Sequence, residues 1–506
     1  MAAYDVIIIG AGHNGLVAAN YLAKAGKKVL VLERREIAGG QLVSESFGDG
    51  CVVDTLHASA QLRPDIVKAL DLRIETPTTV RSAYVSLLGD GKRLQLDADP
   101  TRAADAIRAF SARDAERWPE FVAFMHRATA FLDAAYRTPM PRLPNFAPIS
   151  EGLPLAGLLW KLRRLGGRDM FRVVRAMSMS AEELTSDWFE SDALRAAVAA
   201  LAIHGVTLGS MSAGTGFTLM HNWLNRGGLA HQPTVGGVGK IATALVDALK
   251  ARGGEVRTSA DVQQIIVDRQ RATGVRLANG EEISANSVIS ATDPRHTFLK
   301  LVGASELPPE FVWQAQSIKL RGSVAKVHVE TDGRHGLPVG TLAVAPSIKY
   351  LERAYDAAKY GEVSPAPYLE VTTNGNIISI HFQFAPYALR NGDWSSAGAT
   401  VQQRAIDTLD AHCPGFKASV KRAKTITPHD LESEYGLSEG DLNHGQLILD
   451  QIFFMRPLPG WSNHKTPIDS LYLCGGGVHG GGGISGASGR NAAKIALQAR
   501  RVVGSG

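Results

Sequence analysis

Short blocks of apolar residues near both ends of the chain are typical of buried parallel strands. Residues 6–9 are four β-branched apolar residues in a row, residues 16–23 carry apolar side chains at helical spacing, and residues 28–32 form a second apolar block. This order predicts a βαβ unit. Near the other end, the apolar residues 471–474 precede a glycine-rich loop and a predicted helix at 490–500. The chain therefore predicts a strand, a loop and a helix at each end.

The spacing of apolar residues changes along the middle of the chain. Between about 100 and 230 apolar residues recur at helical spacing, and we expect helices at 101–111 and at 119–135, the second with Pro119 in its first turn. Residues 81–97 and 262–291 instead read as short strands joined by tight turns. Residues 301–424 alternate strands and helices, with strands at 323–329 and 368–384 and a helix at 400–413. The fold class that these patterns predict is α/β.

Three glycines directly follow the first strand, and an acid follows the second. Gly10, Gly12 and Gly15 form a GxGxxG motif, and Glu33 lies at the end of the second strand. In this arrangement the glycines allow a tight turn, a close approach of backbone to a pyrophosphate and close packing of helix on strand. The N–H groups of the helix N-terminus then face the phosphates, and the acid can accept hydrogen bonds from a ribose. The motif predicts a dinucleotide site.

Two further glycine clusters indicate that backbone meets the ligand again. Gly39 and Gly40 lie just beyond Glu33, and a loop at 475–489 joins the last predicted strand to the last helix. A glycine-rich loop that leads into a helix N-terminus is suited to contact with a ligand. We expect both clusters to border the nucleotide site.

Composition excludes several classes of function. The 506 residues carry 54 Lys and Arg against 49 Asp and Glu, without a basic cluster interleaved with aromatic residues, so we expect no nucleic-acid partner. Three scattered cysteines, Cys51, Cys413 and Cys474, provide neither a CxxC redox pair nor a zinc site, and no metal site is indicated. No apolar run reaches membrane-spanning length, and a cytoplasmic location is expected by default.

Residues 155–179 mix apolar and basic side chains. One reading is an amphipathic patch that lies on a membrane surface or guards the entrance for an apolar substrate. The alternative is an ordinary pair of surface helices with arginines in solvent. Gly166 and Gly167 interrupt the helical period and favour the second reading modestly.

The motifs together resemble a known superfamily. The N-terminal fingerprint, Arg34 with Gly39–Gly40 and the loop at 471–484 resemble FAD-dependent oxidoreductases of the phytoene desaturase and amine oxidase superfamily. Residues 380–387, 444–457 and 489–493 look like the pyridine nucleotide-disulfide oxidoreductase domain-containing protein 2 branch within it. The resemblance extends from residue 4 to residue 493.

The resemblance implies a fold and a set of cofactor contacts. An FAD-binding Rossmann-type (GR2-like) domain would comprise 1–80, 230–300 and 425–506, and an inserted α+β substrate domain 81–229 and 301–424, with its helical part at 100–229. The implied FAD contacts run from the pyrophosphate and ribose to adenine and flavin: Gly10, Gly12, Gly15, Glu33, Arg34, Gly39, Gly40, Gln41, Val262, Gly475, Gly476, Gly483 and Ile484. Gln41 stands where many members of the superfamily carry arginine.

The leading hypothesis is an FAD-dependent oxidoreductase that moves a hydride between a largely apolar substrate and flavin N5. An isoprenoid or carotenoid-like substrate is what the family suggests, and oxygen or a quinone would be the electron acceptor. If a side chain exchanges a proton, His479 in the C-terminal loop is the best candidate, ahead of His57, Asp450 and Arg456, the last two of which could equally form a structural ion pair.

Two alternatives stay open. A flavin amine oxidase would need an aromatic pair that frames the flavin, for which Trp461 and Tyr472 are available. A non-enzymatic binding or escort protein could use the same architecture without bound flavin.

Overall fold

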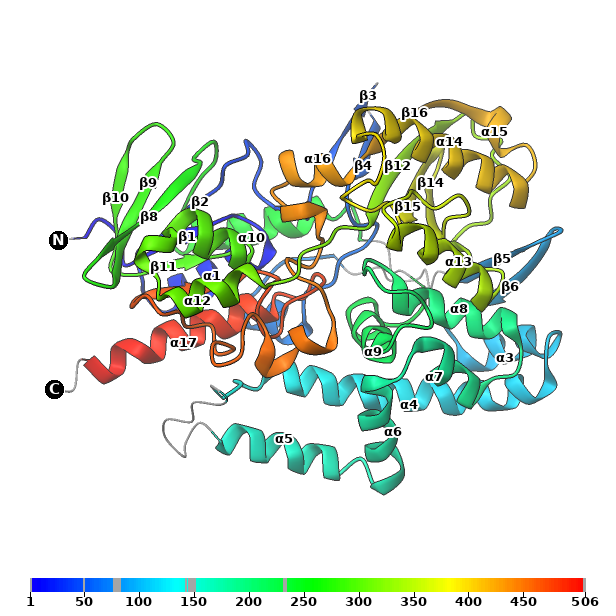
Figure 1. The fold of residues 1–506 in the computed structure, drawn as a ribbon, viewed down its shortest axis with the longest axis horizontal. Coiled ribbons are helices and arrows are strands. Elements are labelled where there is room, and N and C mark those ends of the chain that lie inside the picture. The colour runs from blue at the N-terminus through cyan, green and yellow to red at the C-terminus, as the bar shows by residue number, and fades with distance from the viewer. Residues whose placement is uncertain are drawn as a thin grey trace.

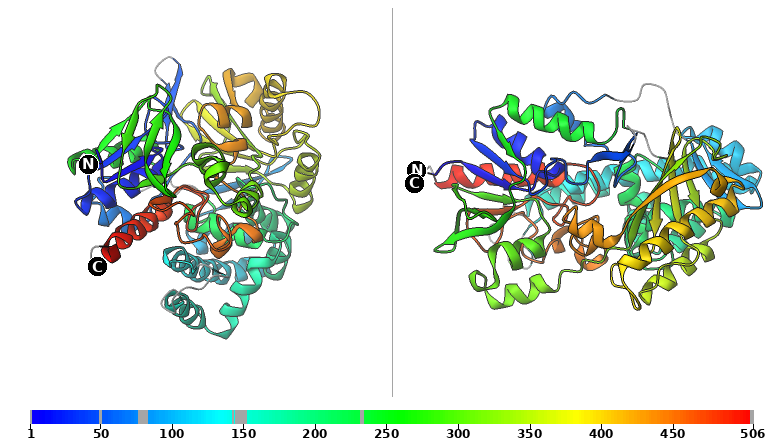
Figure 2. Two further views of the ribbon diagram at one scale, coloured as in Figure 1. Left: turned by 60° about the vertical axis from the view of Figure 1, so that its left-hand side comes forward. Right: turned by 90° about the horizontal axis from the view of Figure 1, so that it is seen from above.

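The structure has two lobes that lie side by side, with a helical layer beneath one of them (Figure 1). It is a computed structural model that describes residues 2–48, 51–75, 83–141, 143, 152–230 and 234–503. The first and last described segments meet in one lobe, and both chain ends lie at the same end of the molecule (Figure 2). The chain thus leaves the first lobe, builds the second and returns.

A five-stranded parallel sheet forms the centre of the first lobe. Its strands, in spatial order, are β17 (Leu471–Leu473), β11 (Val288–Ser290), β1 (Val6–Ile9), β2 (Val29–Leu32) and β7 (Glu255–Arg257). Every neighbouring pair is parallel. The four residues of β1 and of β2 are all buried, because helices or a second sheet cover both faces. This is the Rossmann-type arrangement that the sequence predicted.

Helices pack on one face of this sheet and a small antiparallel sheet packs on the other. The helices are α1 (His13–Lys24), α10 (Gly239–Ala251) and α17 (Ala487–Val503), which share a core with β1 and β2. The small sheet comprises β8 (Val262–Asp268), β9 (Arg271–Leu277) and β10 (Glu282–Ser284). The turns that follow it are α11 (Pro294–His296), residues Thr297–Val302 and α12 (Pro309–Gln316). The predicted strand–loop–helix units at both ends of the chain are confirmed.

A seven-stranded mixed sheet organises the second lobe. Its strands, in spatial order, are β16 (Val420–Ile426), β12 (Val324–Thr331), β15 (Ile377–Gln383), β14 (Leu369–Asn374), β13 (Thr341–Val344), β5 (Tyr84–Gly89) and β6 (Lys92–Leu96). Apolar side chains on one face pack against α14 (Trp394–His412) and α15 (Phe416–Ser419). The opposite face of β12, β14 and β15 carries polar side chains, considered below.

Short elements lie between or beside the two lobes. Those between them are β3 (Ser44–Gly48), β4 (Cys51–Asp54) and α16 (Pro428–Ser433). α2 (Pro64–Ala69) packs in the core of the first lobe, and α13 (Ile348–Lys359) packs in the core of the helical layer. The strands β3 and β4 form a hairpin, and α16 follows β16 back towards the first lobe. The chain therefore crosses between the lobes at several points.

Seven helices form the layer under the second sheet. They are α3 (Pro100–Arg108), α4 (Ala112–Arg137), α5 (Leu153–Arg163), α6 (Gly167–Ser178), α7 (Ala181–Trp188), α8 (Asp192–Ile203) and α9 (Thr215–Arg226). The predicted start of α4 at Pro119 is wrong. Ser111 caps the helix through its Oγ, which accepts from the Asp114 N–H at 3.1 Å, so Pro119 lies inside the helix. Buried Trp118 and Phe121 pack the surrounding turns and offset the backbone hydrogen bond that proline cannot donate.

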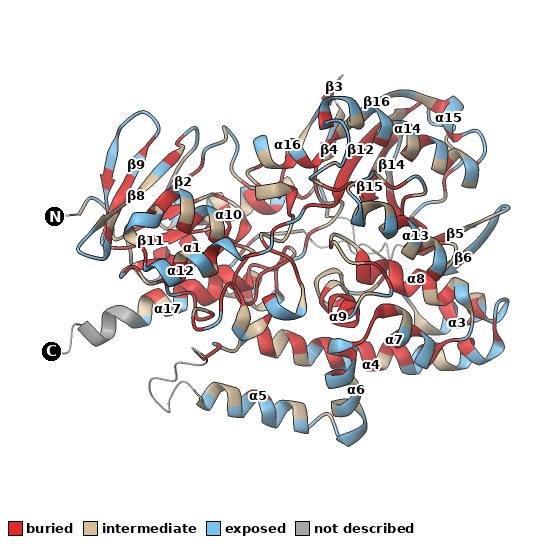
Figure 3. Ribbon diagram, in the orientation of Figure 1, coloured by how far each residue is buried: buried red, intermediate tan, exposed pale blue. Residues whose placement is uncertain are grey.

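The helices α5 and α6 form a hairpin at the edge of this layer. Gly166, with a φ of +83°, separates them, as the two glycines in the sequence predicted. Figure 3 shows largely exposed or intermediate residues along both helices, whereas α4 beside them carries a buried stripe. None of the helices in the described part of the chain is both long and apolar enough to cross a membrane.

Candidate functional site

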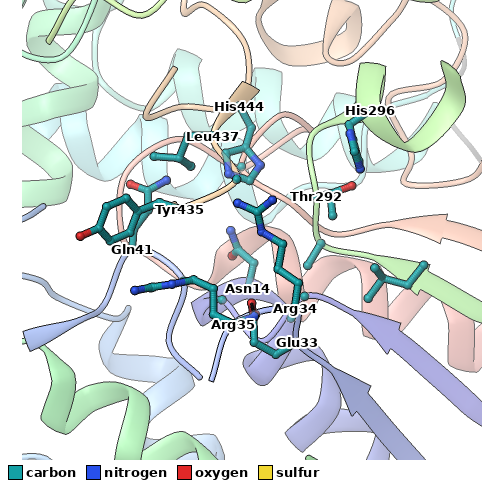
Figure 4. Close-up of a pocket in the computed structure, with 18 of the residues that line it drawn as sticks. Asn14, Glu33, Arg34, Arg35, Gln41, Thr292, His296, Tyr435, Leu437 and His444 are labelled. Atoms are coloured by element: carbon teal, nitrogen blue, oxygen red, sulfur yellow. Dashed lines mark hydrogen bonds between the residues drawn. The ribbon is translucent and has the colours of Figure 1, made fainter. Parts of the chain in front are cut away.

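A cavity of about 240 Å³ opens along the carboxyl end of the five-stranded sheet. Its lining comes from three separated stretches, within residues 9–41, 260–301 and 432–483. Ligands of open α/β sheets bind at this edge, where helix N-termini and loops meet. Figure 4 shows side chains from all three stretches directed into one space.

The glycine fingerprint packs as tightly as its sequence predicted. A Cβ on Gly15 would lie 2.2 Å from the carbonyl oxygen of Gly10, so only glycine lets α1 approach β1 this closely. Gly10 turns the chain at a φ of +93°. Gly12 precedes the helix, whose first turn contains no acidic residue and no side-chain cap. The first N–H groups of α1 are therefore available to an anionic ligand.

The second glycine pair passes directly beside the first motif. The Gly39 N–H donates to the carbonyl of Ala11 at 2.9 Å, and a Cβ on Gly40 would lie 2.8 Å from the Cα of Gly12. Gly40 has a φ of +60°, which favours glycine. Two stretches of bare backbone thus form one wall of the cavity. Side chains at these glycine positions would occupy the space that a ligand could use.

Glu33 is buried at the cavity wall, at the end of β2. Its Oε2 accepts from the Ala11 N–H at 2.8 Å and its Oε1 from the Arg35 N–H at 3.1 Å. These bonds fix the carboxylate beside the fingerprint turn. Val262, the first residue of β8, lines the same part of the cavity and is buried. The acid and the apolar side chain fit the expected ribose and adenine contacts, whose roles stay predictions.

Arg34 and Gln41 connect this wall to the returning chain. The Arg34 guanidinium donates to the carbonyls of Glu432 and Ser433, at 3.3 and 2.8 Å. Gln41 Nε2 donates to the carbonyl of Leu442 at 2.8 Å, and Gln41 Oε1 accepts from His57 Nε2 at 2.7 Å. Both side chains line the cavity. The amide at position 41 thus provides hydrogen bonds where a charge was expected.

The C-terminal loop contributes only part of what was expected. Gly476 and Gly483 line the cavity, whereas Gly475 and Ile484 are not among its lining residues. A Cβ on Gly475 would lie 2.5 Å from the carbonyl oxygen of Thr292, so this glycine serves the packing of the loop on β11. Ile484 is buried in the core beneath α1. The ligand-facing positions of the loop are Gly476, Gly482 and Gly483.

His479 lies outside the lining of the cavity. Its Nε2–H is shared between the carbonyls of Ala135 and Thr138, at 3.2 and 3.1 Å, at the C-terminus of α4. Burial lowers the pKa of His479 to about 3, which leaves the ring neutral. This geometry satisfies two helix-end carbonyls and gives no support to a proton-exchange role. The catalytic role of His479 stays a prediction.

The alternative that Asp450 and Arg456 form a structural ion pair is wrong. Asp450 is exposed and pairs with Lys319 at 2.5 Å. Arg456 is buried and donates to five carbonyls, those of Asn443, Gly445, Gln446, Gln451 and Gly476. The arginine therefore fixes the loop at 443–451 against Gly476, beside the cavity.

Two histidines to which the sequence analysis gave no role line the cavity: His13, which is buried, and His444, which is half-buried. Among the described residues, His13 Nε2 and His444 Nδ1 have no hydrogen-bond partner. Burial lowers the pKa of His13 to about 4 and also lowers that of His444, so both rings are neutral. A buried polar atom without a partner is costly unless a ligand completes it. His13 and Asn14 occupy the variable positions of the glycine fingerprint, which was the available signal.

Comparison with known proteins agrees with this site. The model of the family described as flavin containing amine oxidoreductase matches residues 15–381. The rat protein named pyridine nucleotide-disulfide oxidoreductase domain-containing protein 2 is 30% identical, over 98% of this chain and 93% of its own. A lycopene-forming phytoene desaturase of Pseudescherichia vulneris is 24% identical, over 95% of this chain and 96% of its own.

A solved structure shows the same fold at low sequence identity. It is a variant of putrescine oxidase that matches with a TM-score of 0.57 and 17% identity, over 98% of this chain and 99% of its own. The predicted superfamily, the α/β fold class with a Rossmann-type domain and the FAD cofactor are thereby confirmed. The bare-backbone cradle and the two imidazoles, each with one ring nitrogen that has no partner among the described residues, fit a dinucleotide. The chain belongs to the flavin-containing amine oxidoreductase family, and it is an FAD-dependent oxidoreductase.

Proposed function

We propose that the protein is a dehydrogenase or desaturase that acts on a largely apolar, isoprenoid or carotenoid-like molecule. FAD, when bound, supplies hydride transfer at flavin N5, with oxygen or a quinone as the expected electron acceptor. Relatives named phytoene desaturases support this choice of substrate class. The single observation that carries the proposal is the cavity between three chain segments, whose backbone cradle fits FAD.

The residues of this chain bind and orient the cofactor in the proposal. Gly12 and Gly40 admit the pyrophosphate to the N-terminus of α1, and Glu33 is placed for the ribose. The neutral rings of His13 and His444 offer hydrogen bonds to polar cofactor atoms. Arg456 holds the loop at 443–451 in place and keeps this wall rigid. None of these roles requires a side chain to exchange a proton.

Anaerobic bleaching tests the proposed reaction. Holoprotein is mixed with phytoene in detergent, and the visible flavin absorbance is followed. Loss of absorbance together with a newly desaturated product supports the proposal. No bleaching by phytoene, by shorter isoprenoid hydrocarbons or by isoprenoid acids would contradict the substrate class while leaving FAD binding intact.

The family description also favours an amine oxidase as a second candidate. The aromatic pair expected for it is not assembled at the cavity, because Trp461 packs against Phe311 at 5.5 Å and Tyr472 lies in the core within β17. Tyr435 is the aromatic residue that lines the cavity. Hydrogen peroxide release from a panel of amines would decide for this candidate. A purified protein without flavin absorbance would instead favour the escort reading.

We also propose that the α5–α6 hairpin contacts an anionic membrane surface. The side chains of Leu153, Trp160 and Phe171 are 66, 59 and 67% exposed, and Leu159 and Val174 are exposed as well. Residues 152–179 contain six lysines and arginines, with Asp169 as the only acid among them. Exposed apolar side chains among cations match the boundary between headgroups and acyl chains. Such a contact would bring the protein to a lipophilic substrate.

Vesicle binding tests the hairpin directly. We expect holoprotein to sediment with vesicles that contain phosphatidylglycerol and less with pure phosphatidylcholine, since the basic residues add about 1 kcal/mol each near an anionic surface. The double variant L159S/F171S should lose about tenfold in binding. The matched control V339S removes an apolar side chain that is exposed elsewhere, on the connection before β13. Equal binding of all three proteins would contradict the proposal.

A further inference from the structure

A second, smaller cavity lies between the two lobes, where the seven-stranded sheet faces the segment that follows β4. It measures about 30 Å³, and Lys326, His328, Glu370, His381, His204 and His57 are among its lining residues. His57 Nε2 donates to Gln41 Oε1 at 2.7 Å, and Gln41 lines the cofactor cavity. The hydrogen-bonded side chains of His57 and Gln41 therefore separate the two cavities.

Strand register explains why polar groups gather there. Lys326 on β12 pairs with His381 on β15, which pairs with Glu370 on β14. Two residues along, His328 pairs with Ser379, which pairs with Thr372. Residues two apart on a strand share a face, so these two rows form one polar surface. The intervening residues face the apolar core beneath α14.

The Lys326 ammonium in this surface is only partly satisfied. Its side chain is buried, with 7% of the residue exposed. Nζ donates to His381 Nδ1 at 3.0 Å, and no carboxylate of the described residues lies within 4.0 Å of it. An ammonium has three N–H donors, so its remaining donors have no partner in the described part of the chain. Burying such a charge is costly unless an anion accompanies it.

Lys326 is the one lysine or arginine among the described residues that line this cavity, and the carboxyls of Asp54 and Glu370 line it as well. Glu370, 4% exposed, is paired with Arg226 at 2.9 Å. The His381 Nε2–H donates to Gln383 Oε1 at 2.8 Å, so its Nδ1 is the acceptor for Lys326. Burial keeps the imidazoles of His204, His328 and His381 neutral by lowering their pKa values. Among the described lining residues, the cavity thus presents the Lys326 ammonium beside neutral imidazoles. Its two carboxyls already have partners, because Glu370 pairs with Arg226 and Asp54 Oδ1 accepts from Ser44 Oγ and from the Val238 N–H.

We propose that this cavity binds the carboxylate head group of an otherwise apolar substrate, with Lys326 as its counter-ion. The proposal rests on the proposed function and narrows its substrate class to apolar acids. The volume exceeds the roughly 10–15 Å³ that one water molecule needs, so the cavity has room for a small polar head group, and the apolar part of the substrate would lie outside it. The ammonium gains the hydrogen-bond acceptors that the protein does not supply. The neighbouring Gln41 places this head group next to the cofactor cavity.

Three probes of one length test the charge preference. Hexanoate, hexanamide and hexylamine are titrated into holoprotein, and dissociation constants are taken from the shift of the unfolding midpoint and from the flavin spectrum. We expect hexanoate to bind at least about tenfold more tightly than either other probe. The variant K326M should lose about tenfold in hexanoate affinity and keep its affinity for hexanamide.

The matched control is K424M. Lys424 lies on β16, exposed, and is not among the lining residues of the cavity. This variant removes the same charge from the same sheet and should bind hexanoate like the wild type. Equal loss in K326M and K424M would overturn the proposal, because a general field effect would then explain it.

Two further outcomes are decisive. Tighter binding of hexylamine than of hexanoate would overturn the proposal in favour of an amine site at Glu370. Should K326M not fold, the comparison of the three probes on the wild type decides alone. A failure of this proposal can be distinguished from a failure of the proposed function. Calorimetry measures hexanoate binding even to a protein that lacks FAD or whose flavin is never reduced.

Discussion

The two cavities of this protein are built from different materials. The cofactor cavity has one wall of bare backbone, at Gly12 and Gly40, and further glycines at Gly476 and Gly483, with the N-terminus of α1 beside them. The small cavity is walled by titratable side chains from three strands. A backbone wall recognises what all dinucleotides share, whereas a wall of side chains distinguishes one substrate from another. This difference separates the common part of the function from the specific part.

The largest effect is expected from closing the backbone wall. The variant G40A adds a Cβ 2.8 Å from the Cα of Gly12, at a φ of +60°. We expect FAD affinity to fall by about a thousandfold, on the order of 4 kcal/mol. Reconstitution of apoprotein with FAD measures this. The control G26A carries similar backbone strain, at a φ of +76°, with no atom within 4 Å of the new Cβ; equal FAD binding by both variants would show that the wall is not at Gly40.

Removing the buried charge from the other cavity should increase stability. Burial lowers the pKa of Lys326 to about 8, below its ordinary value of 10.5. The unfolded chain therefore binds the proton more tightly, and the penalty on the folded state is full below pH 8 and disappears as pH rises towards 10.5. The stability advantage of K326M over the wild type should thus shrink by about 3 kcal/mol over this range.

Urea unfolding at several pH values, with the difference between the two proteins as the readout, checks this expectation. Subtracting the unfolding free energy of the wild type from that of K326M removes the contribution of all other titrating groups. If this difference stays constant between pH 7 and 10.5, Lys326 is not buried as a charge.

A smaller effect on stability is expected at His479, which lines neither cavity. The variant H479A removes the donor for the carbonyls of Ala135 and Thr138 and should cost about 2 kcal/mol of unfolding free energy. The rate of flavin reduction by a substrate should change little, because His479 does not line either cavity. A large loss of reduction rate with FAD content unchanged would restore His479 as a proton-exchanging residue.

The smallest effect on FAD affinity is expected from Glu33, whose side chain lies beside the backbone wall. The variant E33Q keeps the shape of Glu33 but removes the charge that accepts from the Ala11 N–H. We expect FAD affinity to fall by about tenfold, or about 1.4 kcal/mol. The exposed E36Q is the control, and FAD titration is the measurement. A loss as large as that of G40A would mean that side chains rather than backbone dominate cofactor binding.

The two regions also differ in how far sequence alone could predict them. The cofactor site could be predicted from residue spacing, because its main residues are close together in the chain: Gly10, Gly12, Gly15 and Glu33. Lys326, Glu370 and His381 become neighbours only through strand register, which depends on how distant strands pair. Their signal was the alternation of polar and apolar residues within β12, where the polar face turned out to be buried.

Side-chain roles in loops were harder to predict than strands. His479 stands in a glycine-rich loop next to ligand-facing glycines, yet its ring turns to the end of α4. His444, in the motif at 444–457 and without a predicted ligand role, lines the cavity instead. Glycine spacing indicates where backbone meets a ligand, but the direction of a neighbouring side chain depends on packing partners that the motif does not contain.

The visible spectrum of the purified protein shows whether the cofactor cavity holds FAD. We expect flavin absorbance from the isolated protein and, after denaturation, release of FAD rather than FMN or a nicotinamide nucleotide, in a ratio close to one per chain. G26A should retain this spectrum and G40A should lose it. A colourless wild-type protein that cannot be reconstituted with FAD would show that the cavity is not an FAD site.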